Sequence, residues 1–171
     1  MYTLSRSGLA TIAAMEMCRV LPYTDRDGRP CVGYSHVLSG EEQVTGLLTA
    51  TKDPYGSGVT EPVARRALRV DLRTVEDYVN RMVPQRLYAH EFDTIVSWVW
   101  SIGIQGLKSP NLFVIIRAGR HENVPMELAK WIRQDGAVSQ TLIARRRIES
   151  DMWVGRYPEP IRNLPKSPDT L

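Results

Sequence analysis

The stretch EMCRVLPYTDRDGRPCVGYSH, residues 16–36, carries the features that decide the fold. It begins where a helical pattern ends, because Pro22 cannot continue a helix. Residues 25–28, Asp-Arg-Asp-Gly, are typical of a tight turn, since aspartate and glycine favour turn conformations. The apolar residues 31–34 that follow suit a β-strand. The stretch therefore predicts a helix that leads into a β-hairpin.

The segment before the hairpin has the pattern of an amphipathic helix. Ser5 or Ser7 can cap its N-terminus. Leu9 and Ile12 then recur at helical spacing, and Glu16 falls in the last turn. This first helix thus delivers a carboxylate to the start of the hairpin.

Two further helix starts follow the hairpin. Residues 39–42, Ser-Gly-Glu-Glu, form a capping box and predict a short helix to about residue 48. Residues 60–62, Thr-Glu-Pro, combine a capping residue, an acid and a first-turn proline, and the apolar residues after them keep a helical period up to Pro84. The chain then stays helical in period to Trp153, with an apolar stripe at residues 92, 95, 96 and 99. Prolines after Arg156 indicate an extended tail.

These elements predict a mainly α-helical protein of the α+β class. Residues 13–59 should form a small α+β lobe that contains the hairpin. The long helix should join it to a helical lobe made of residues 60–157 and the first helix. Residues 158–171 should form a proline-rich tail.

Composition narrows the possible classes of protein. The 171 residues suffice for one domain with a hydrophobic core. A net charge of +3 favours anionic partners without choosing among nucleic acid, lipid and cell-wall polymers. The two cysteines lack the spacing of a zinc site, and a disulfide between Cys18 and Cys31 stays open. The apolar run near the start is too short for a membrane span of ~20 residues, and it does not resemble a secretory signal.

Glu16 and Asp25 are candidates for a pair of catalytic carboxylates. A glycosidic bond is commonly cut by one protonated carboxyl group, which donates to the leaving oxygen, and one ionised carboxylate. A helix end and a polar turn would give the two groups different environments. Turn aspartates are common, however, so the spacing alone does not exclude an ordinary surface glutamate and a structural aspartate.

The order of residues around the pair resembles a known family. Eight residues separate Glu16 from Asp25, five separate Asp25 from Cys31, and Gly-Tyr-Ser-His follows at 33–36. This resembles the phage-type (T-even phage-like) lysozymes of glycoside hydrolase family 24, whose pattern is Glu, eight residues, Asp or Cys, five residues, Thr, and then Gly-x-Gly-His. The long helix and the segments 92–112 and 142–153 are also similar, which leaves only the tail unmatched.

The resemblance implies a lysozyme-like fold and a peptidoglycan hydrolase. Such a muramidase cleaves the β-1,4 bond between N-acetylmuramic acid and N-acetylglucosamine during bacterial lysis by a phage, with inversion and without a metal or cofactor. Glu16 would be the general acid and Asp25 the second carboxylate. Cys31 stands at the position of the family's threonine. There are two further departures, because Ser35 and Met17 each stand where the family has a glycine.

The cysteine leaves two mechanisms open. A thiol is a weaker hydrogen-bonding group than a hydroxyl, so Cys31 would position water in a slower inverting enzyme. Alternatively, its thiolate would attack the sugar and change the stereochemical course. The departures also leave room for a catalytically impaired, lysozyme-like structural or binding protein of a phage particle.

The resemblance also assigns residues around the catalytic ones. His36 would pair with Asp71 of the long helix and support the site. Four further positions correspond to residues that contact glycan in relatives, although a tryptophan at helical spacing also suits a core. These substrate-binding candidates are Val37, Trp100, Asn111 and Glu127.

The partners follow from the proposed class. The expected substrate is the glycan strands of peptidoglycan, and the expected oligomeric state is a monomer. Nucleic-acid binding is not expected, because no helix-turn-helix or RNP motif is present. The protein would stay in the host cytoplasm until a holin releases it to the periplasmic wall, or it would be carried in the virion as a tail component. The arginines at 145–147 would either be a solvated helix face or attract an anionic envelope.

Overall fold

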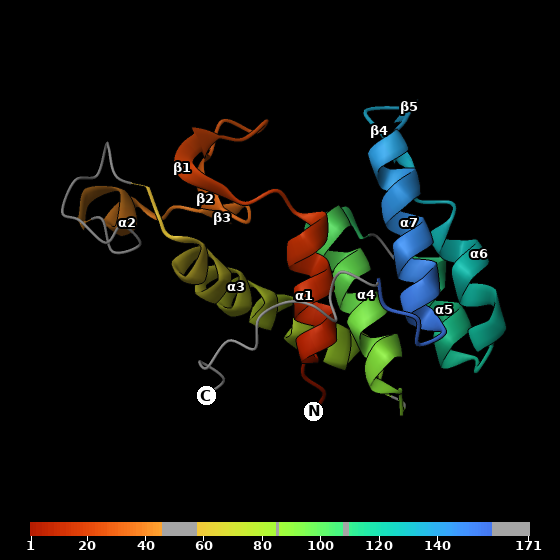
Figure 1. The fold of residues 1–171 in the computed structure, drawn as a ribbon. Coiled ribbons are helices and arrows are strands. Elements are labelled where there is room, and N and C mark those ends of the chain that lie inside the picture. Colours follow the sequence, from red (N-terminus) through yellow and green to blue (C-terminus); the bar gives the residue numbers. More distant parts are fainter. Residues whose placement is uncertain (46–57, 85, 108–109, 159–171) are drawn as a thin grey trace. The chain divides into compact units, whose positions relative to one another are not determined.

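The computed structural model describes residues 1–45, 58–84, 86–107 and 110–158 (Figure 1). Helices predominate, which confirms the mainly α-helical fold of the α+β class that the sequence predicts. The α-helices are α1 (Arg6–Met15), α2 (Gly40–Thr45), α3 (Glu61–Met82), α4 (Ala89–Ile102), α5 (Asn111–Arg117), α6 (Val124–Leu128) and α7 (Gln140–Trp153). Short 3-10 turns are η1 (Ile104–Gly106) and η2 (His121–Asn123). The strands are β1 (Arg19–Thr24), β2 (Pro30–Gly33), β3 (His36–Val37), β4 (Arg133–Gln134) and β5 (Ala137–Val138).

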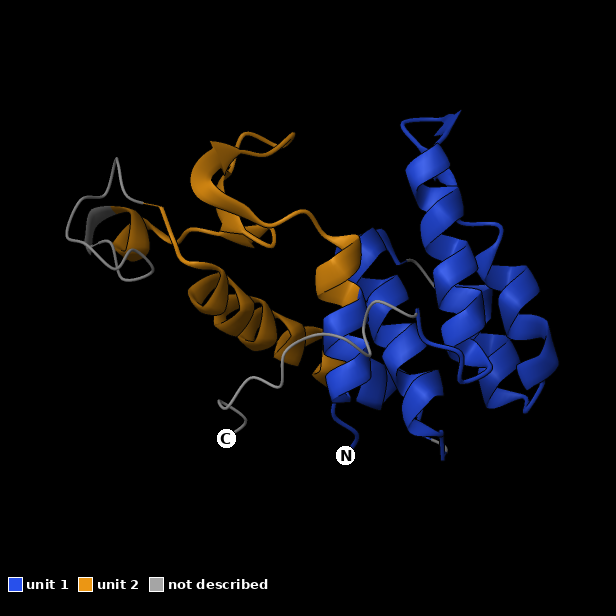
Figure 2. Ribbon diagram, in the orientation of Figure 1, with its two compact units in different colours: residues 1–11, 78–171 blue, residues 12–77 orange. Residues whose placement is uncertain are grey.

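The chain divides into two compact units (Figure 2). The hairpin unit is Ile12–Asp77, and the helical unit is Met1–Thr11 together with Tyr78–Leu171. Both divisions fall inside helices, α1 and α3, so each of these helices contributes residues to both units. The lobes expected from the sequence had their boundary before the long helix, at residue 59. Of the expected proline-rich tail, residues 159–171 lie outside the described residues.

The hairpin unit contains a three-stranded antiparallel sheet in the order β1-β2-β3. Tyr23 lies opposite Cys31 in the first pair of strands, and Cys31 lies opposite Val37 in the second. The tight turn predicted at 25–28 is present, with the N–H of Gly28 donating to the carbonyl of Asp25 at 3.1 Å. The sheet therefore places residue 25 at one end of β1 and residue 31 beside it on β2.

The second strand packs closely on α3. Gly33 has a positive φ of 64°, and a Cβ atom at this position would lie 2.7 Å from the Cβ of Ala64. Glycine is therefore required here by both conformation and space. The buried hydroxyl of Tyr34 donates to Glu61 Oε1 at 3.2 Å, at the start of the same helix. These contacts fix the hairpin on α3.

The core of the helical unit is built around α4. The apolar stripe predicted on this helix is confirmed, because Phe92, Ile95, Val96 and Val99 are all buried. Trp98 is also completely buried, and its ring meets Trp131 and Phe113 edge to face. No helix among the described residues is both long enough and apolar enough to cross a membrane.

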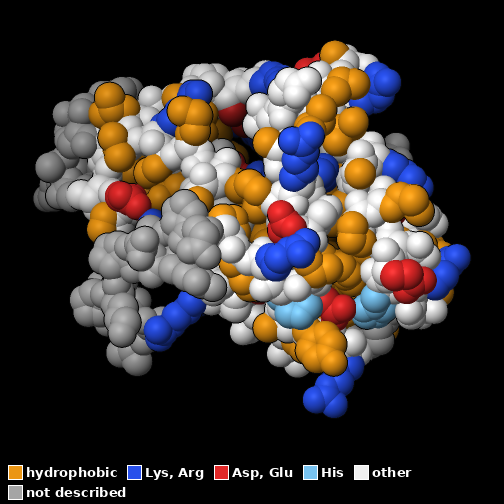
Figure 3. Space-filling view, turned by 45° about the vertical axis from the view of Figure 1, so that its right-hand side comes forward, with side chains coloured by type: hydrophobic (Ala, Val, Ile, Leu, Met, Phe, Trp, Pro, Cys, Tyr) orange, Lys and Arg blue, Asp and Glu red, His pale blue; other side chains and the backbone are white. Residues whose placement is uncertain are grey.

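An ion-pair network joins α4 to α7 in this unit. Glu149 is completely buried and accepts hydrogen bonds from Ser97 Oγ at 2.7 Å and Arg145 Nε at 3.1 Å. Arg146, itself 2% exposed, also pairs with Glu149. Only Arg147 of the run 145–147 is exposed, and basic side chains are scattered rather than gathered on the face in Figure 3. The run is therefore largely a structural feature of α7.

Two other carboxylates of the helical unit also point inward. Glu91 lies with its Oε1 2.8 Å from His121 Nδ1. Asp93 is completely buried and accepts from the N–H of Ser5 at 2.9 Å and from the hydroxyl of Tyr157 at 2.7 Å. Since Ser5 precedes α1 and Tyr157 follows α7, Asp93 ties both ends of the described chain to α4.

Candidate active site

Glu16 lies directly after the last residue of α1. Its N–H still donates to the carbonyl of Ile12 at 3.0 Å, as in a helical turn, and its side chain is half-buried. At the other end of α1, Ser5 Oγ accepts from the N–H of Gly8 at 3.0 Å, so Ser5 is the capping residue of the two candidates. The helix therefore ends with a carboxylate at its junction with the hairpin.

Asp25 is held in the hairpin turn by several donors. Its Oδ1 accepts from the N–H groups of Asp27 at 2.9 Å and Arg29 at 2.8 Å. Its Oδ2 accepts from Arg29 Nε at 2.8 Å. The backbone N–H of Arg29, followed by the guanidinium group, holds the pKa of Asp25 below its ordinary value. Asp25 is therefore an ionised carboxylate at neutral pH.

The Cys31 thiol lies next to this carboxylate. The distance from its Sγ to Asp25 Oδ2 is 3.7 Å, and Cys31 is only 1% exposed. Burial raises the pKa of the thiol, and the nearby Asp25 carboxylate raises it further. The thiol is thus protonated at neutral pH, which disfavours a thiolate nucleophile. Cys18 is half-buried, and both cysteines are free.

His36 pairs with Asp71, as the resemblance implied. The distance from His36 Nδ1 to Asp71 Oδ2 is 2.8 Å, and on the other side of the ring Nε2 lies 3.3 Å from Glu42 Oε1. The hydrogen bond with Asp71 is the main cause of a raised His36 pKa. Sequence reasoning missed the contact with Glu42. The predicted capping box was its signal, because Glu42 also accepts from the N–H of Ser39 at 2.8 Å.

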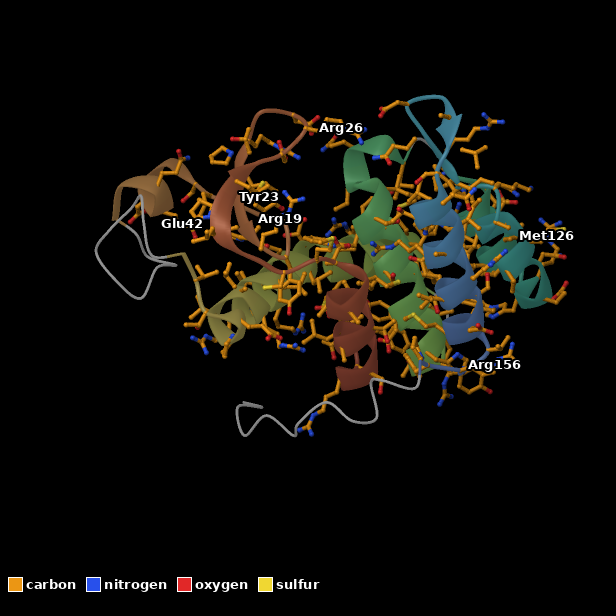
Figure 4. All side chains as sticks on the ribbon, turned by 45° about the horizontal axis from the view of Figure 1, so that its top comes forward. Arg19, Tyr23, Arg26, Glu42, Met126 and Arg156 are labelled. Carbon is orange, nitrogen blue, oxygen red and sulfur yellow. The ribbon has the colours of Figure 1, made fainter. Side chains whose placement is uncertain are left out.

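Ser35 occupies a strained position next to His36. Its φ is +63°, in the left-handed region that favours glycine. The hydroxyl of Tyr23 donates to Ser35 Oγ at 3.3 Å, and the guanidinium of Arg19 lies 4.5 Å from the centre of the Tyr23 ring. Figure 4 shows Arg19 and Tyr23 side by side on the hairpin. Serine in place of the family's glycine therefore keeps the turn and adds one contact to it.

The four substrate-binding candidates are divided between the units. Val37, which is 42% exposed, belongs to the hairpin unit. In the helical unit, Asn111 Nδ2 donates to Glu127 Oε2 at 3.0 Å, so these two are in contact. Trp100 of α4 is half-buried, unlike its core neighbour Trp98.

Glu127 stays ionised although it is buried, because its neighbours favour the charged form. Burial acts to raise its pKa, but hydrogen bonds from Lys130 Nζ at 2.6 Å and from Asn111 outweigh this effect and lower it. Glu127 therefore offers an acceptor with fixed orientation beside the exposed Asn111. Within the described part of the chain, no group of three or more His, Cys, Asp or Glu side chains is placed to hold a metal ion.

The comparison with known families covers most of these residues. The family model for phage lysozyme matches residues 13–149, which include Glu16, Asp25, Cys31 and both members of the His36–Asp71 pair. The chain belongs to the phage lysozyme family.

Curated relatives of this phage lysozyme family member include phage endolysins. The chain is 29% identical to the endolysin of Bacillus phage B103 over 106 residues, which are 58% of this chain and 40% of that protein. It is 22% identical to the endolysin of Salmonella phage P22 over 154 residues, which are 90% and 99% of the two chains. The match spans 40% and 43% of the lengths of the first two relatives, the second being the endolysin of Bacillus phage PZA.

Solved structures share the fold over nearly the whole chain. The muramidase domain of SpmX from Asticaccaulis excentricus has a TM-score of 0.76 at 26% identity, covering 90% of this chain and 99% of that one. The endolysin from Escherichia coli O157:H7 phage FAHEc1 has a TM-score of 0.74 at 25% identity, covering 92% and 98%. The lysozyme-like fold predicted from the sequence is therefore confirmed.

Proposed function

We propose that this phage lysozyme family member hydrolyses peptidoglycan during bacterial lysis. The bond cleaved is the β-1,4 linkage between N-acetylmuramic acid and N-acetylglucosamine. Membership of the family, relatives named endolysin and a structural neighbour named muramidase support this substrate. The observation that carries the proposal is the constellation of one hairpin, with Glu16 at its start, ionised Asp25 in its turn and the Cys31 thiol 3.7 Å from Asp25.

Each of the three residues has a distinct role in this mechanism. Glu16 is the general acid that protonates the leaving glycosidic oxygen. Asp25 stays ionised and stabilises or activates the attacking water. Cys31 keeps its proton because of burial, and its thiol helps to position that water. The reaction therefore inverts the anomeric configuration, since no nucleophile of the protein attacks the sugar.

The other candidate residues either support the catalytic site or bind the substrate. Asp71 and Glu42 hold His36 from both sides, which fixes β3 and the hairpin without taking part in the reaction. Val37, Trp100, Asn111 and Glu127 contact the glycan strand. The protein acts as a monomer on the periplasmic wall after holin-dependent release from the host cytoplasm. Carriage in the virion as a tail component is the variant of this route.

Clearing of permeabilised Gram-negative cells tests the proposal. Wild type should reduce turbidity, and Glu16→Gln should lower the rate about 10²–10⁴-fold, because it removes the general acid. Glu41→Gln is the matched control, since Glu41 is an exposed glutamate of α2. Equal inactivity of wild type and Glu16→Gln would refute hydrolysis and favour an impaired structural or binding protein.

Product stereochemistry tests the inverting course separately. NMR of the first product formed from soluble glycan strands distinguishes the two anomers before they equilibrate. We expect inversion. Retention of configuration would instead require a covalent intermediate and would contradict the role given to Cys31.

A further inference from the structure

The Arg29 guanidinium clamps one oxygen of the second carboxylate. Arg29 Nε and Nη2 lie 2.8 Å and 2.7 Å from Asp25 Oδ2, and Nη2 also lies 3.0 Å from Asp27 Oδ2. Arg29 therefore bridges the two aspartates of the turn. Its side chain is 56% exposed, whereas that of Asp25 is 19% exposed.

The two oxygens of Asp25 have different surroundings. Oδ1 is engaged by the backbone of the turn, through the N–H groups of Asp27 and Arg29. Oδ2 faces only side chains among its described contacts, namely the guanidinium of Arg29 and the thiol of Cys31 at 3.7 Å. Arg29 therefore supplies the side-chain donors that hold Oδ2 beside Cys31, and it adds to the hold of the turn backbone on Oδ1.

We propose that Arg29 is the positioning residue of the second carboxylate, because its guanidinium holds Asp25 Oδ2 toward the Cys31 thiol. This inference rests on the proposed function, in which Asp25 and Cys31 act together on the attacking water. Residue 29 is one of the five residues between Asp25 and Cys31, and the family pattern specifies no residue type at this position.

The proposal has two consequences for the reaction. Without the guanidinium, only the two backbone N–H groups that donate to Oδ1 still hold the Asp25 carboxylate, so its orientation is less tightly fixed. Small misplacements of a reacting group cost rate rather than binding. The ionised form of Asp25 is also less favoured, since charged hydrogen bonds from the two guanidinium nitrogens to Oδ2 stabilise the carboxylate. Among the contacts of the described residues, Asp27 and Cys31 also face Asp25, and neither replaces the lost positive charge.

The test compares kcat, KM and the pH profile on soluble peptidoglycan strands for three variants. Arg29→Gln should lower kcat about 10–100-fold with KM little changed, because geometry and not binding is lost. The acid limb of its pH profile should move to higher pH. Arg29→Lys should restore part of the kcat and reverse part of the shift in the acid limb, since lysine keeps the charge but not the two donors of the guanidinium. Arg26→Gln is the control, because it removes one charge from the same turn and leaves the Arg29–Asp25 ion pair in place.

The outcomes separate this inference from the proposed function. An active wild type whose Arg29→Gln variant keeps the wild-type kcat and acid limb overturns the role of Arg29 alone. An equal loss in Arg26→Gln also overturns it, because the effect would then be one of net charge. An inactive wild type refutes the proposed function and with it the role of Arg29. If Arg29→Gln does not fold, the Arg29→Lys variant tests the proposal instead. An Arg29→Lys variant with the kcat and pH profile of the wild type would overturn it.

Discussion

Replacing Asp71 with asparagine removes the negative charge that faces His36 and keeps a side chain of the same size. The two side chains are only 14% and 23% exposed for His36 and Asp71, and their Nδ1 and Oδ2 atoms are 2.8 Å apart. Asparagine can still accept a hydrogen bond at this position. The expected loss is therefore only the extra strength that charge gives to the bond.

The size of that loss follows from general values. A hydrogen bond to a charged group contributes about 1.5–3 kcal/mol and a neutral one about 0.5–1.5 kcal/mol. The difference for this partly exposed pair is about 1 kcal/mol in the free energy of unfolding. For a chain of this length, that lowers the Tm by about 2–4 °C.

The pH dependence gives the prediction its sign. The hydrogen bond with Asp71 raises the His36 pKa in the folded protein. The stabilisation is therefore fully present below the unfolded pKa of about 6.5 and is lost as the pH rises through the raised folded value. Asp71→Asn should thus lower the Tm clearly at pH 5.5 and only slightly at pH 9, while most of the turnover is retained.

Thermal unfolding of three proteins at these two pH values makes the measurement. Asp77→Asn serves as the control, since Asp77 is an exposed aspartate on the same helix, α3, and it should change stability by less than about 0.5 kcal/mol. An equal loss of Tm for Asp71→Asn at both pH values would refute the charge argument. Complete loss of turnover with unchanged melting would show that Asp71 acts in the reaction itself.

Three further predictions concern other parts of the chain. In the native protein, iodoacetamide should label Cys18 before Cys31, because Cys31 is 1% exposed and its pKa is raised; faster labelling of Cys31, measured by peptide mass, would contradict this. Ser35→Gly should raise stability by about 1 kcal/mol in denaturant unfolding, since it relieves a left-handed backbone. Glu149→Gln should lower the free energy of unfolding by about 3–5 kcal/mol in denaturant unfolding, because it leaves two buried or half-buried guanidinium groups without their carboxylate. Asp151→Asn is the control, since Asp151 is exposed and its loss should change stability little.

Much of the fold could be predicted because its signals are local. The turn at 25–28, the capping box at 39–42 and the long α3 helix each follow from neighbouring residues, and the structure contains all three. The apolar stripe of α4 followed from helical period in the same way. The contact between His36 and Asp71 is not local, and it was expected only through the family resemblance.

The contacts that the sequence did not indicate are those in which one side chain has two partners. Glu42 was expected to cap α2, but it also faces the ring of His36. Arg146 carries a charge that normally favours a surface position, yet Glu149 three residues later draws it into the core. Arg29 folds back across the turn onto Asp25, and a pattern of residue types does not specify that direction.

The inward carboxylates of the helical unit also determine which charges an approaching molecule meets. The buried acids among the described residues of this unit are Glu91, Asp93, Glu127 and Glu149. The exposed charges of its described part are mostly positive, among them Arg6, Arg81, Arg86, Arg117, Arg120, Lys130, Arg133 and Arg147. A net charge of +3 for the whole chain therefore understates how many cationic contacts this surface offers to a polyanion. Adsorption to an anionic matrix should accordingly weaken steeply as salt screens these exposed groups.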